Sequence, residues 1–180
     1  MISTIYFRFV EESDAAFIYG LRKNPDYNKY LSAVDDGIEK QITWIRKYKE
    51  KEKAKQEYYY IIHRKDNDLP IGTVRLYDFI PQESSFCWGS WILNENKTKY
   101  AALESAIMIY DFAFFELGYN RCHMDIRKGN KKVIEFHKKF GVRIINESEI
   151  DYFGHYFKED YLKIRENIVH IINNYNNQYI

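Results

Sequence analysis

The sequence predicts a mixed α/β fold whose central sheet has six or seven strands and carries helices on both faces. Three β-branched and aromatic runs follow one another closely at 57–64, 71–79 and 85–93, which is typical of an antiparallel meander. After residue 93 helix-like segments with an apolar period of about 3.6 alternate with strand-like ones. This alternation indicates parallel crossover pairing, with the helices packed on the sheet.

The first half of the chain opens with a strand and two helices. Ile5 to Val10 is β-branched and aromatic, and therefore predicts the first strand. Ser13 stands in the capping position of a helix that ends before Pro25. Residues 24–36 are polar and turn-rich. A second helix is predicted over 37–53, because apolar residues recur there at helical spacing.

The second half alternates helices and strands. A long helix is predicted to begin near Tyr100 and to end at Gly118, since a glycine just past a helix accepts the left-handed conformation. Asn130 caps a shorter helix that closes at Gly141. The other predicted elements are strands at 121–126, 142–146 and 152–164, the last interrupted near Gly154, and a short helix at 167–175.

Composition narrows the class of protein. The 180 residues suit a single domain, and 27 basic against 26 acidic residues give a net charge of +1, which argues against a nucleic-acid binder. Cys87 and Cys122 form no metal-binding pattern and are expected to be buried free thiols, and no metal is expected. The chain shows no leader pattern and no membrane-length apolar run, so no membrane association and a cytoplasmic location are expected.

Two junctions carry candidate chemistry. The segment 94–99 leads from a strand into a helix, where unpaired amides and the residues Lys97, Thr98 and Lys99 favour a phosphate or diphosphate, although most such loops bind nothing. His137 lies between apolar residues on the inward half of its helix. It is either a core or edge residue, or a proton donor or acceptor near neutral pH.

At this point the residues carry a family resemblance. The stretch from about Phe86 to Val142 resembles the GNAT superfamily of acetyl-CoA-dependent N-acyltransferases, because Asn130, Phe136, Lys139 and Gly141 match the family helix in register. The preceding Ala113-Phe114-Phe115-Glu116-Leu117-Gly118-Tyr119-Asn120-Arg121 is also similar to the family. The resemblance covers nearly the whole chain. It implies one GNAT-like domain over 1–180, with an acceptor-side half at 1–80, an acetyl-CoA-side half at 85–165 and a C-terminal tail at 166–180.

The resemblance implies acetyl-CoA as co-substrate and no metal. The family holds the pantetheine arm along the third meander strand and the pyrophosphate on the loop after it, but in that loop only Ala101 keeps the family residue. Backbone amides can still bind the pyrophosphate, since they do not depend on side-chain identity. The residues expected to bind the cofactor are Trp91, Ile92, Leu93, Lys97, Thr98, Lys99, Tyr100, Ala101, Asn130, Lys132, Phe136 and Lys139.

Catalysis is implied to be direct transfer from the thioester to a deprotonated amine. His137 stands where the family often has a tyrosine that protonates the leaving thiolate, so it either replaces that acid or the role is lost. Asp125, His123 and Ser90 are the polar candidates for a base; Asp125 is equally a charged strand end. The expected catalytic residues are His137, Asp125 and Ser90.

The resemblance leads us to expect a primary amine on a small molecule as the acceptor. Leu21-Arg22-Lys23-Asn24-Pro25, Leu31-Ser32 and Gln41-x-x-Trp44-Ile45 resemble GNAT members that acetylate nucleotide-linked amino sugars in polysaccharide pathways. They are more distantly similar to the branch that acetylates ribosomal-protein N-termini, and a non-catalytic module that binds acyl-CoA or a partner is a third reading. A homodimer is possible. The residues expected to bind the substrate are Trp44, Tyr77, His123 and Tyr152.

Overall fold

The computed structural model describes residues 1–33 and 36–178. It contains a seven-stranded mixed sheet in the order β1-β2-β3-β4-β5-β7-β6, with helices on both sides, which confirms the predicted fold class. The strands are β1 (Ile5–Phe9), β2 (Tyr58–Arg64), β3 (Pro70–Ile80), β4 (Ser85–Leu93), β5 (Arg121–Arg127), β6 (Arg143–Glu147) and β7 (Asp151–Phe157). The α-helices are α1 (Ala15–Lys23), α2 (Pro25–Asn28), α3 (Ile38–Lys53), α4 (Ala101–Asp111), α5 (Lys131–Phe140) and α6 (Lys158–Asn176).

Strand pairing follows the predicted directions with one difference in neighbours. β1, β2 and β3 pair antiparallel, and β4 pairs with β5 in parallel at Ser85 with Arg121 and at Phe86 with Cys122. The sequence predicts a further parallel neighbour after α5. Instead β7 lies between β5 and β6 and pairs antiparallel with both. β6 therefore runs parallel to β5, with β7 between them.

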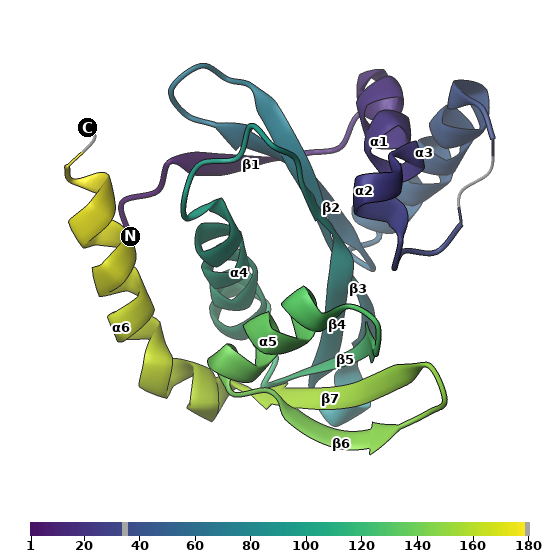
Figure 1. Cartoon of the computed structure of the whole chain (residues 1–180). Helices are drawn as coiled ribbons and strands as arrows, with labels where there is room; N and C mark the ends of the chain where they lie inside the picture. The colour runs from purple at the N-terminus through teal and green to yellow at the C-terminus, as the bar shows by residue number, and fades with distance from the viewer. Residues whose placement is uncertain (34–35, 179–180) are drawn as a thin grey trace. The chain divides into compact units, whose positions relative to one another are not determined.

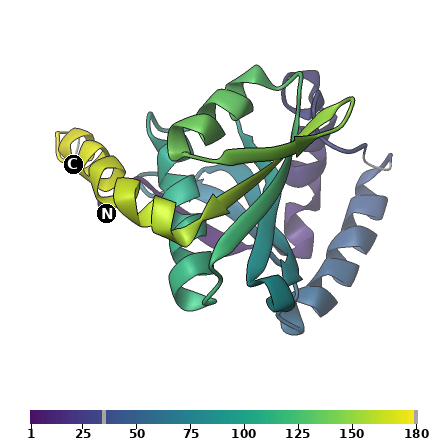
Figure 2. The ribbon, with the colours of Figure 1, turned by 90° about the horizontal axis from the view of Figure 1, so that it is seen from below.

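The end of the chain differs from the prediction. The expected strand over 152–164 ends at Phe157, and α6 begins at the next residue and runs through most of the expected tail (Figure 2). Glu159 and Asp160 occupy the first turn of α6, where acidic residues favour the helix dipole. Aromatic residues repeat through both segments, so the sequence pattern did not separate strand from helix.

The chain divides into two compact units. The N-terminal unit comprises Thr4–Asp78 and Gly89–Ala102, and the C-terminal unit comprises Met1–Ser3, Phe79–Trp88 and the chain from Leu103 onward. β4 contributes to both units because the boundary falls between Trp88 and Gly89. We describe each unit by itself.

The core of the N-terminal unit lies between its helices and strands. In this unit α1 and α3 lie against one another (Figure 1). Tyr48 of α3 is buried, and its hydroxyl accepts the backbone N–H of Tyr59 at 2.7 Å and donates to Glu52. An aromatic ring is thus buried with its polar atom satisfied. The cluster consists of Val10, Ala15, Ile18, Ile45, Tyr48, Tyr59 and Ile61.

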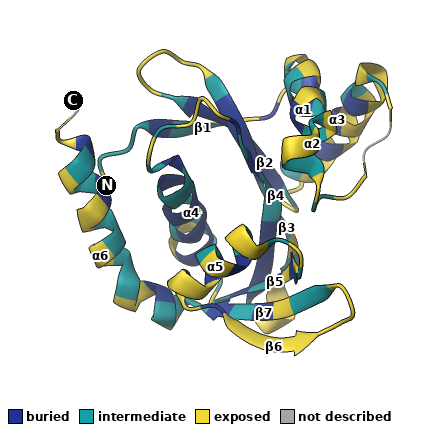
Figure 3. Ribbon diagram, in the orientation of Figure 1, coloured by how far each residue is buried: buried dark blue, intermediate teal, exposed yellow. Residues whose placement is uncertain are grey.

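The core of the C-terminal unit is aromatic. Tyr110 of α4 is fully buried, stacks on Phe114 at 5.6 Å and meets Tyr156 of β7 edge-on at 5.0 Å between ring centroids. Such offset and edge-on pairs add to the burial energy. Cys87 and Cys122 are buried free thiols, as predicted. By contrast, all five residues of β6 are exposed (Figure 3).

Candidate active site

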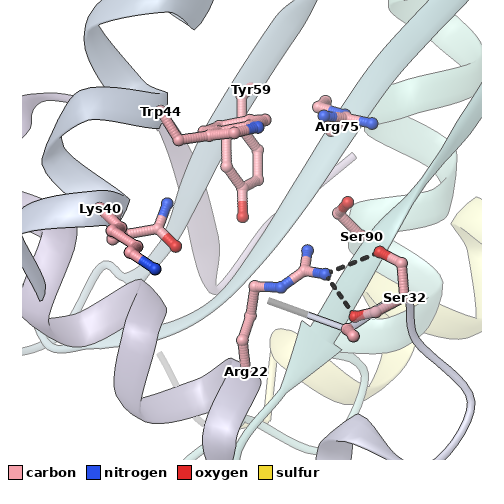
Figure 4. A pocket seen from close by; sticks show the side chains of 9 residues that line it. Arg22, Ser32, Lys40, Trp44, Tyr59, Arg75 and Ser90 are labelled. Carbon is pink, nitrogen blue, oxygen red and sulfur yellow. Dashed lines mark hydrogen bonds between the residues drawn. The ribbon is translucent and has the colours of Figure 1, made fainter. Parts of the chain in front are cut away.

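A cavity of about 390 Å³ lies within the N-terminal unit. Its walls come from α1, the segment after α2, the first turns of α3 and the strands β2, β3 and β4, and their side chains converge on one space (Figure 4). This volume lies within the range of small-molecule binding sites. The lining residues are Arg22, Ser32, Ala33, Lys40, Gln41, Trp44, Tyr59, Arg75 and Ser90.

The cavity is positively charged. Arg22, Lys40 and Arg75 line it, and none of the described lining residues is acidic. The buried Nε atoms of Arg22 and Arg75 have no hydrogen-bond partner within the described part of the chain. An unsatisfied buried donor costs about 1–3 kcal/mol, and more when it is charged. The lining therefore suits an anionic ligand that accepts these N–H groups.

Each arginine is held in place by its remaining contacts. Nη2 of Arg22 donates to the backbone oxygen and to Oγ of Ser32, both at 3.0 Å. The Arg75 guanidinium lies 4.4 Å from the ring centroid of Tyr77 and 5.5 Å from that of Trp44. Cation–π contacts hold a guanidinium without using its N–H donors. Both groups are thus positioned while a donor remains available.

Aromatic side chains form one wall. Trp44 stacks on Tyr48 with centroids 5.9 Å apart and meets Tyr59 edge-on at 5.7 Å. Tyr59 is buried, and this burial raises the pKa of its hydroxyl, while the charges of Arg22 and Arg75 act in the opposite direction. Both arginines thus lie near the same phenol. The expected substrate residue Trp44 and the expected catalytic residue Ser90 line this one cavity.

Ser90 sits at an irregular point of β4. Its φ is 47°, in the left-handed region that a serine rarely adopts. Its backbone oxygen accepts a hydrogen bond from Oγ1 of Thr73 at 2.8 Å. Non-glycine residues in this region cluster at functional sites. Next to it, a Cβ placed on Gly89 would lie 3.0 Å from the hydroxyl of Tyr77. The expected substrate residue Tyr77 thus packs against the strand at the irregular point.

Residues 96–101, which are expected to bind the pyrophosphate, are held by hydrogen bonds to other residues of the N-terminal unit. Oγ1 of Thr98 and Oγ1 of Thr4 lie 2.6 Å apart, and Nη1 of Arg64 donates to the backbone oxygen of Asn96 at 3.1 Å. The backbone N–H of Lys97 donates to the backbone oxygen of Asn94, and that of Ala101 donates to the backbone oxygen of Thr98, both at 3.2 Å, so these two amides are already paired. Residues 96–101 include Lys97 and Lys99 and no acidic residue. This composition fits a diphosphate.

Three of the expected cofactor residues lie on β4, near its end. Ile92 is buried, whereas Trp91 and Leu93 are half-buried. The other expected cofactor residues are on α5, in the C-terminal unit. Asn130 caps this helix by accepting the N–H of Val133 at 3.4 Å, as predicted. Lys132 and Lys139 are exposed, and Phe136 is half-buried.

His137 is a buried group of the C-terminal unit. Its ring meets the indole of Trp88 edge-on, and its Nδ1 is buried without a partner among the described residues. Desolvation lowers the pKa of His137 to about 4. The imidazole is therefore neutral at pH 7. It carries an N–H that can donate a hydrogen bond, rather than the proton of an imidazolium.

The remaining expected residues lie on β5 and β7. His123 and Asp125 share one face of β5, as the strand period predicts, with Asp125 exposed. Nδ1 of His123 lies 2.7 Å from Oγ of Ser85, a pair that the sequence analysis missed. Tyr152 of β7 lies under Nζ of Lys128, 5.1 Å from its ring centroid. The expected substrate residues are thus divided between the two units.

Arg22, Lys40 and Arg75 are absent from the sequence-based list of site residues. Arg22 lies in a segment that carries the resemblance to sugar acetyltransferases, which was one available signal. Arg75 interrupts the apolar run of β3, and a charged residue in a largely buried strand was another. Lys40 gives no signal in the sequence. Among the described residues no group of three His, Cys, Asp or Glu side chains is placed to hold a metal ion.

Comparison with known proteins defines the class. Residues 4–143 match the family model described as an acetyltransferase (GNAT) domain, so the chain belongs to the GNAT acetyltransferase family. The protein is therefore an N-acetyltransferase of a family that uses acetyl-CoA as acetyl donor.

Individual relatives refine this result. The chain is 30% identical over 148 residues to a probable N-acetyltransferase of Bacillus subtilis, YjcK, covering 76% of this chain and 82% of the relative. It is 48% identical to the solved structure of apo FdhC, described as a nucleotide-linked sugar GNAT, with a TM-score of 0.85 over 92% of this chain and 93% of that one. A Vibrio cholerae spermidine N-acetyltransferase in complex with CoA and spermine is 18% identical, with a TM-score of 0.74 over 88% and 98%. That last likeness shows the fold alone.

Proposed function

We propose that this enzyme transfers the acetyl group of acetyl-CoA to a primary amine on a nucleotide-linked amino sugar. The observation that carries the proposal is the 48% identity to FdhC, which extends over 92% of the chain and hence over both compact units. The acceptor-side segments that resemble sugar acetyltransferases also supply Arg22, Gln41 and Trp44 to the cavity.

The charge of the cavity supports an anionic acceptor. A polyamine is a chain of cations and would meet three positive side chains with no acidic partner among the described lining residues. A nucleotide-linked sugar carries two phosphates and presents its amine on the sugar. The cavity therefore favours the nucleotide-linked sugar over a polyamine or a free cationic peptide terminus.

In the proposed reaction the amine nitrogen attacks the thioester carbonyl, the C–N bond forms and the C–S bond breaks. The attacking amine must be neutral, so a base or water path takes its proton. Ser90, at the irregular point of β4, and Asp125 are the proposed groups for this step. We propose that the neutral His137 donates a hydrogen bond from its N–H to the sulfur as negative charge develops there, and that CoA leaves as the thiolate.

The co-substrate is proposed to bind through main-chain groups and cations. The backbone of β4 near its end would hold the pantetheine arm, and the segment 97–101 would hold the diphosphate. The side chains proposed for these contacts are Trp91, Ile92, Leu93, Lys97, Thr98, Lys99, Tyr100, Ala101, Asn130, Lys132, Phe136 and Lys139. The cytoplasmic location, the polysaccharide pathway and a homodimer stay predictions. No helix in the described ranges has the length and apolar character needed to span a bilayer.

A thiol-release assay with acetyl-CoA tests the proposal. The acceptor panel contains thymidine- and uridine-diphosphate-linked amino sugars, the same free amino sugars, spermidine and a short peptide with a free N-terminus. We expect turnover with at least one nucleotide-linked amino sugar at a kcat/KM well above that of every other acceptor. Turnover confined to the peptide would support the ribosomal-protein branch instead, and turnover confined to spermidine would contradict the proposal.

A further inference from the structure

We infer that the cavity of the N-terminal unit is an anion subsite in which Arg22, Lys40 and Arg75 bind the diphosphate of the acceptor. The inference rests on the proposed function for the identity of the acceptor. Anion binding itself, however, is measurable without any acetyl transfer.

The first argument is the state of Arg22. Its Nη2 donates hydrogen bonds to the backbone oxygen and to Oγ of Ser32, but its Nε is buried and has no partner in the described ranges. The side chain is thereby held in one orientation with an N–H left for a ligand. A phosphate oxygen is the acceptor that a guanidinium prefers for short, charge-assisted hydrogen bonds.

The second argument is the state of Arg75. Its nearest acid is Glu57, at 3.8 Å from Nη1, and Glu57 is bound more closely by Lys51, at 2.6 Å. The charge of Arg75 is therefore only partly balanced within the protein. Its Nε is also buried without a described partner, while its flat face is occupied by Tyr77. The edge of the guanidinium is thus the part that remains to bind a ligand.

The third argument is convergence. The two arginines come from α1 and β3, and Lys40 comes from the first turn of α3, so three separate elements direct cations to one cavity (Figure 4). Like charges repel, and placing three of them around one space costs stability when no acidic residue is among the described lining residues. A bound polyanion removes this repulsion and accepts the unused N–H groups at the same time.

Isothermal titration calorimetry provides the test. Wild-type protein is titrated with thymidine diphosphate, uridine diphosphate, inorganic pyrophosphate, spermidine and acetyl-CoA. Arg22→Gln, Arg75→Gln and Arg75→Lys are compared with Arg46→Gln, which alters an exposed arginine of α3 that pairs with Glu12 outside the cavity. Thermal melting of each variant reports whether it is folded.

We expect the wild type to bind pyrophosphate and at least one nucleoside diphosphate, more weakly as the salt concentration rises. Arg22→Gln and Arg75→Gln should each bind roughly 10- to 100-fold more weakly, because one charged hydrogen bond is lost. Arg75→Lys should recover part of the affinity, and Arg46→Gln should bind as the wild type does. Acetyl-CoA affinity should be the same in all of them.

Three results would overturn the inference. The first is that the wild type binds neither pyrophosphate nor any nucleoside diphosphate. The second is that folded Arg22→Gln and Arg75→Gln bind these anions as tightly as the wild type does. The third is that those variants lose affinity for acetyl-CoA, which would assign the cavity to the co-substrate. The proposed function fails separately. If nucleoside diphosphates bind through Arg22 and Arg75 but no nucleotide-linked amino sugar is acetylated, the subsite stands and the acceptor assignment falls.

Discussion

The imidazole of His137 packs edge-on against the indole of Trp88, with ring centroids 5.6 Å apart. This contact removes the ring from water, and desolvation disfavours its charged form. The helix position at which the family resemblance implies a tyrosine thus holds a neutral imidazole, whose buried Nδ1 has no partner among the residues that the structure describes.

The first prediction concerns turnover. His137→Phe keeps a ring against Trp88 but has no N–H, so we expect kcat to fall about 10²-fold with an unchanged dissociation constant for acetyl-CoA. Because the ring is neutral above about pH 4, kcat of the wild type should show no loss attributable to His137 between pH 6 and 8. Single-turnover kinetics and calorimetry measure both quantities. A kcat within threefold of the wild type would remove His137 from the chemistry.

The second prediction concerns stability against pH. The pKa of a histidine is ordinarily 6.5 and that of buried His137 is about 4, so between these values the unfolded chain binds a proton that the folded chain does not. The contribution of His137 is therefore complete above pH 6.5 and is lost as the pH falls toward 4, by about 3 kcal/mol at pH 4. Urea unfolding of His137→Phe should show a smaller loss between pH 7 and 4.5 than the wild type.

The control for this measurement is His170→Gln, because His170 is exposed on α6. It should retain the full pH dependence of the wild type. Identical pH dependence in His137→Phe and the wild type would show that the ring titrates normally in the folded protein.

The third prediction concerns the strand that carries the expected pantetheine contacts. A Cβ on Gly72 of β3 would overlap the backbone oxygen of Ile92 and lie 3.0 Å from its carbonyl carbon. Gly72→Ala must therefore displace β4 near its end. We expect a loss of about 1–3 kcal/mol in unfolding free energy and a weaker binding of acetyl-CoA.

Gly20→Ala is the matched control for this substitution. Gly20 lies inside α1 with no atom within 4 Å of the new Cβ, so alanine should stabilise the chain by about 0.5–1 kcal/mol and leave acetyl-CoA binding unchanged. Urea unfolding and calorimetry on both variants give the comparison. Normal acetyl-CoA affinity in a destabilised Gly72→Ala would argue against the role of β4 in holding the co-substrate.

The fourth prediction concerns the chain ends within the C-terminal unit. Nδ2 of Asn176 donates to the backbone oxygen of Ile2 at 2.8 Å and to the buried carboxylate of Glu104 at 3.0 Å. Asn176→Ala removes both bonds and should lower the unfolding free energy by about 2–3 kcal/mol. Asn177→Ala, on an exposed neighbouring position, should change it by less than about 0.5 kcal/mol. Equal effects of the two substitutions in urea unfolding would show that the Asn176 contacts do not contribute.

The sequence predicted local features well where a single residue type enforces them. Asn130 caps α5 and Gly141 follows it with a φ of 92°, both as expected from the spacing. Gly118, likewise expected past the end of a helix, has a φ of 78°. The boundary between β7 and α6 was missed, because no capping side chain marks Phe157 and aromatic residues continue across it.

The sequence by itself determined the order of the strands and of the longer helices, the two buried thiols and the family, because these depend on apolar periodicity and on residues that match in register. Only the tertiary structure brought Arg22, Lys40 and Arg75 to one cavity and lowered the pKa of His137. The physical reason is that electrostatics and desolvation depend on the distances between side chains from different elements. Those distances arise from the packing of elements that are far apart in the sequence, and no local pattern of residues predicts them.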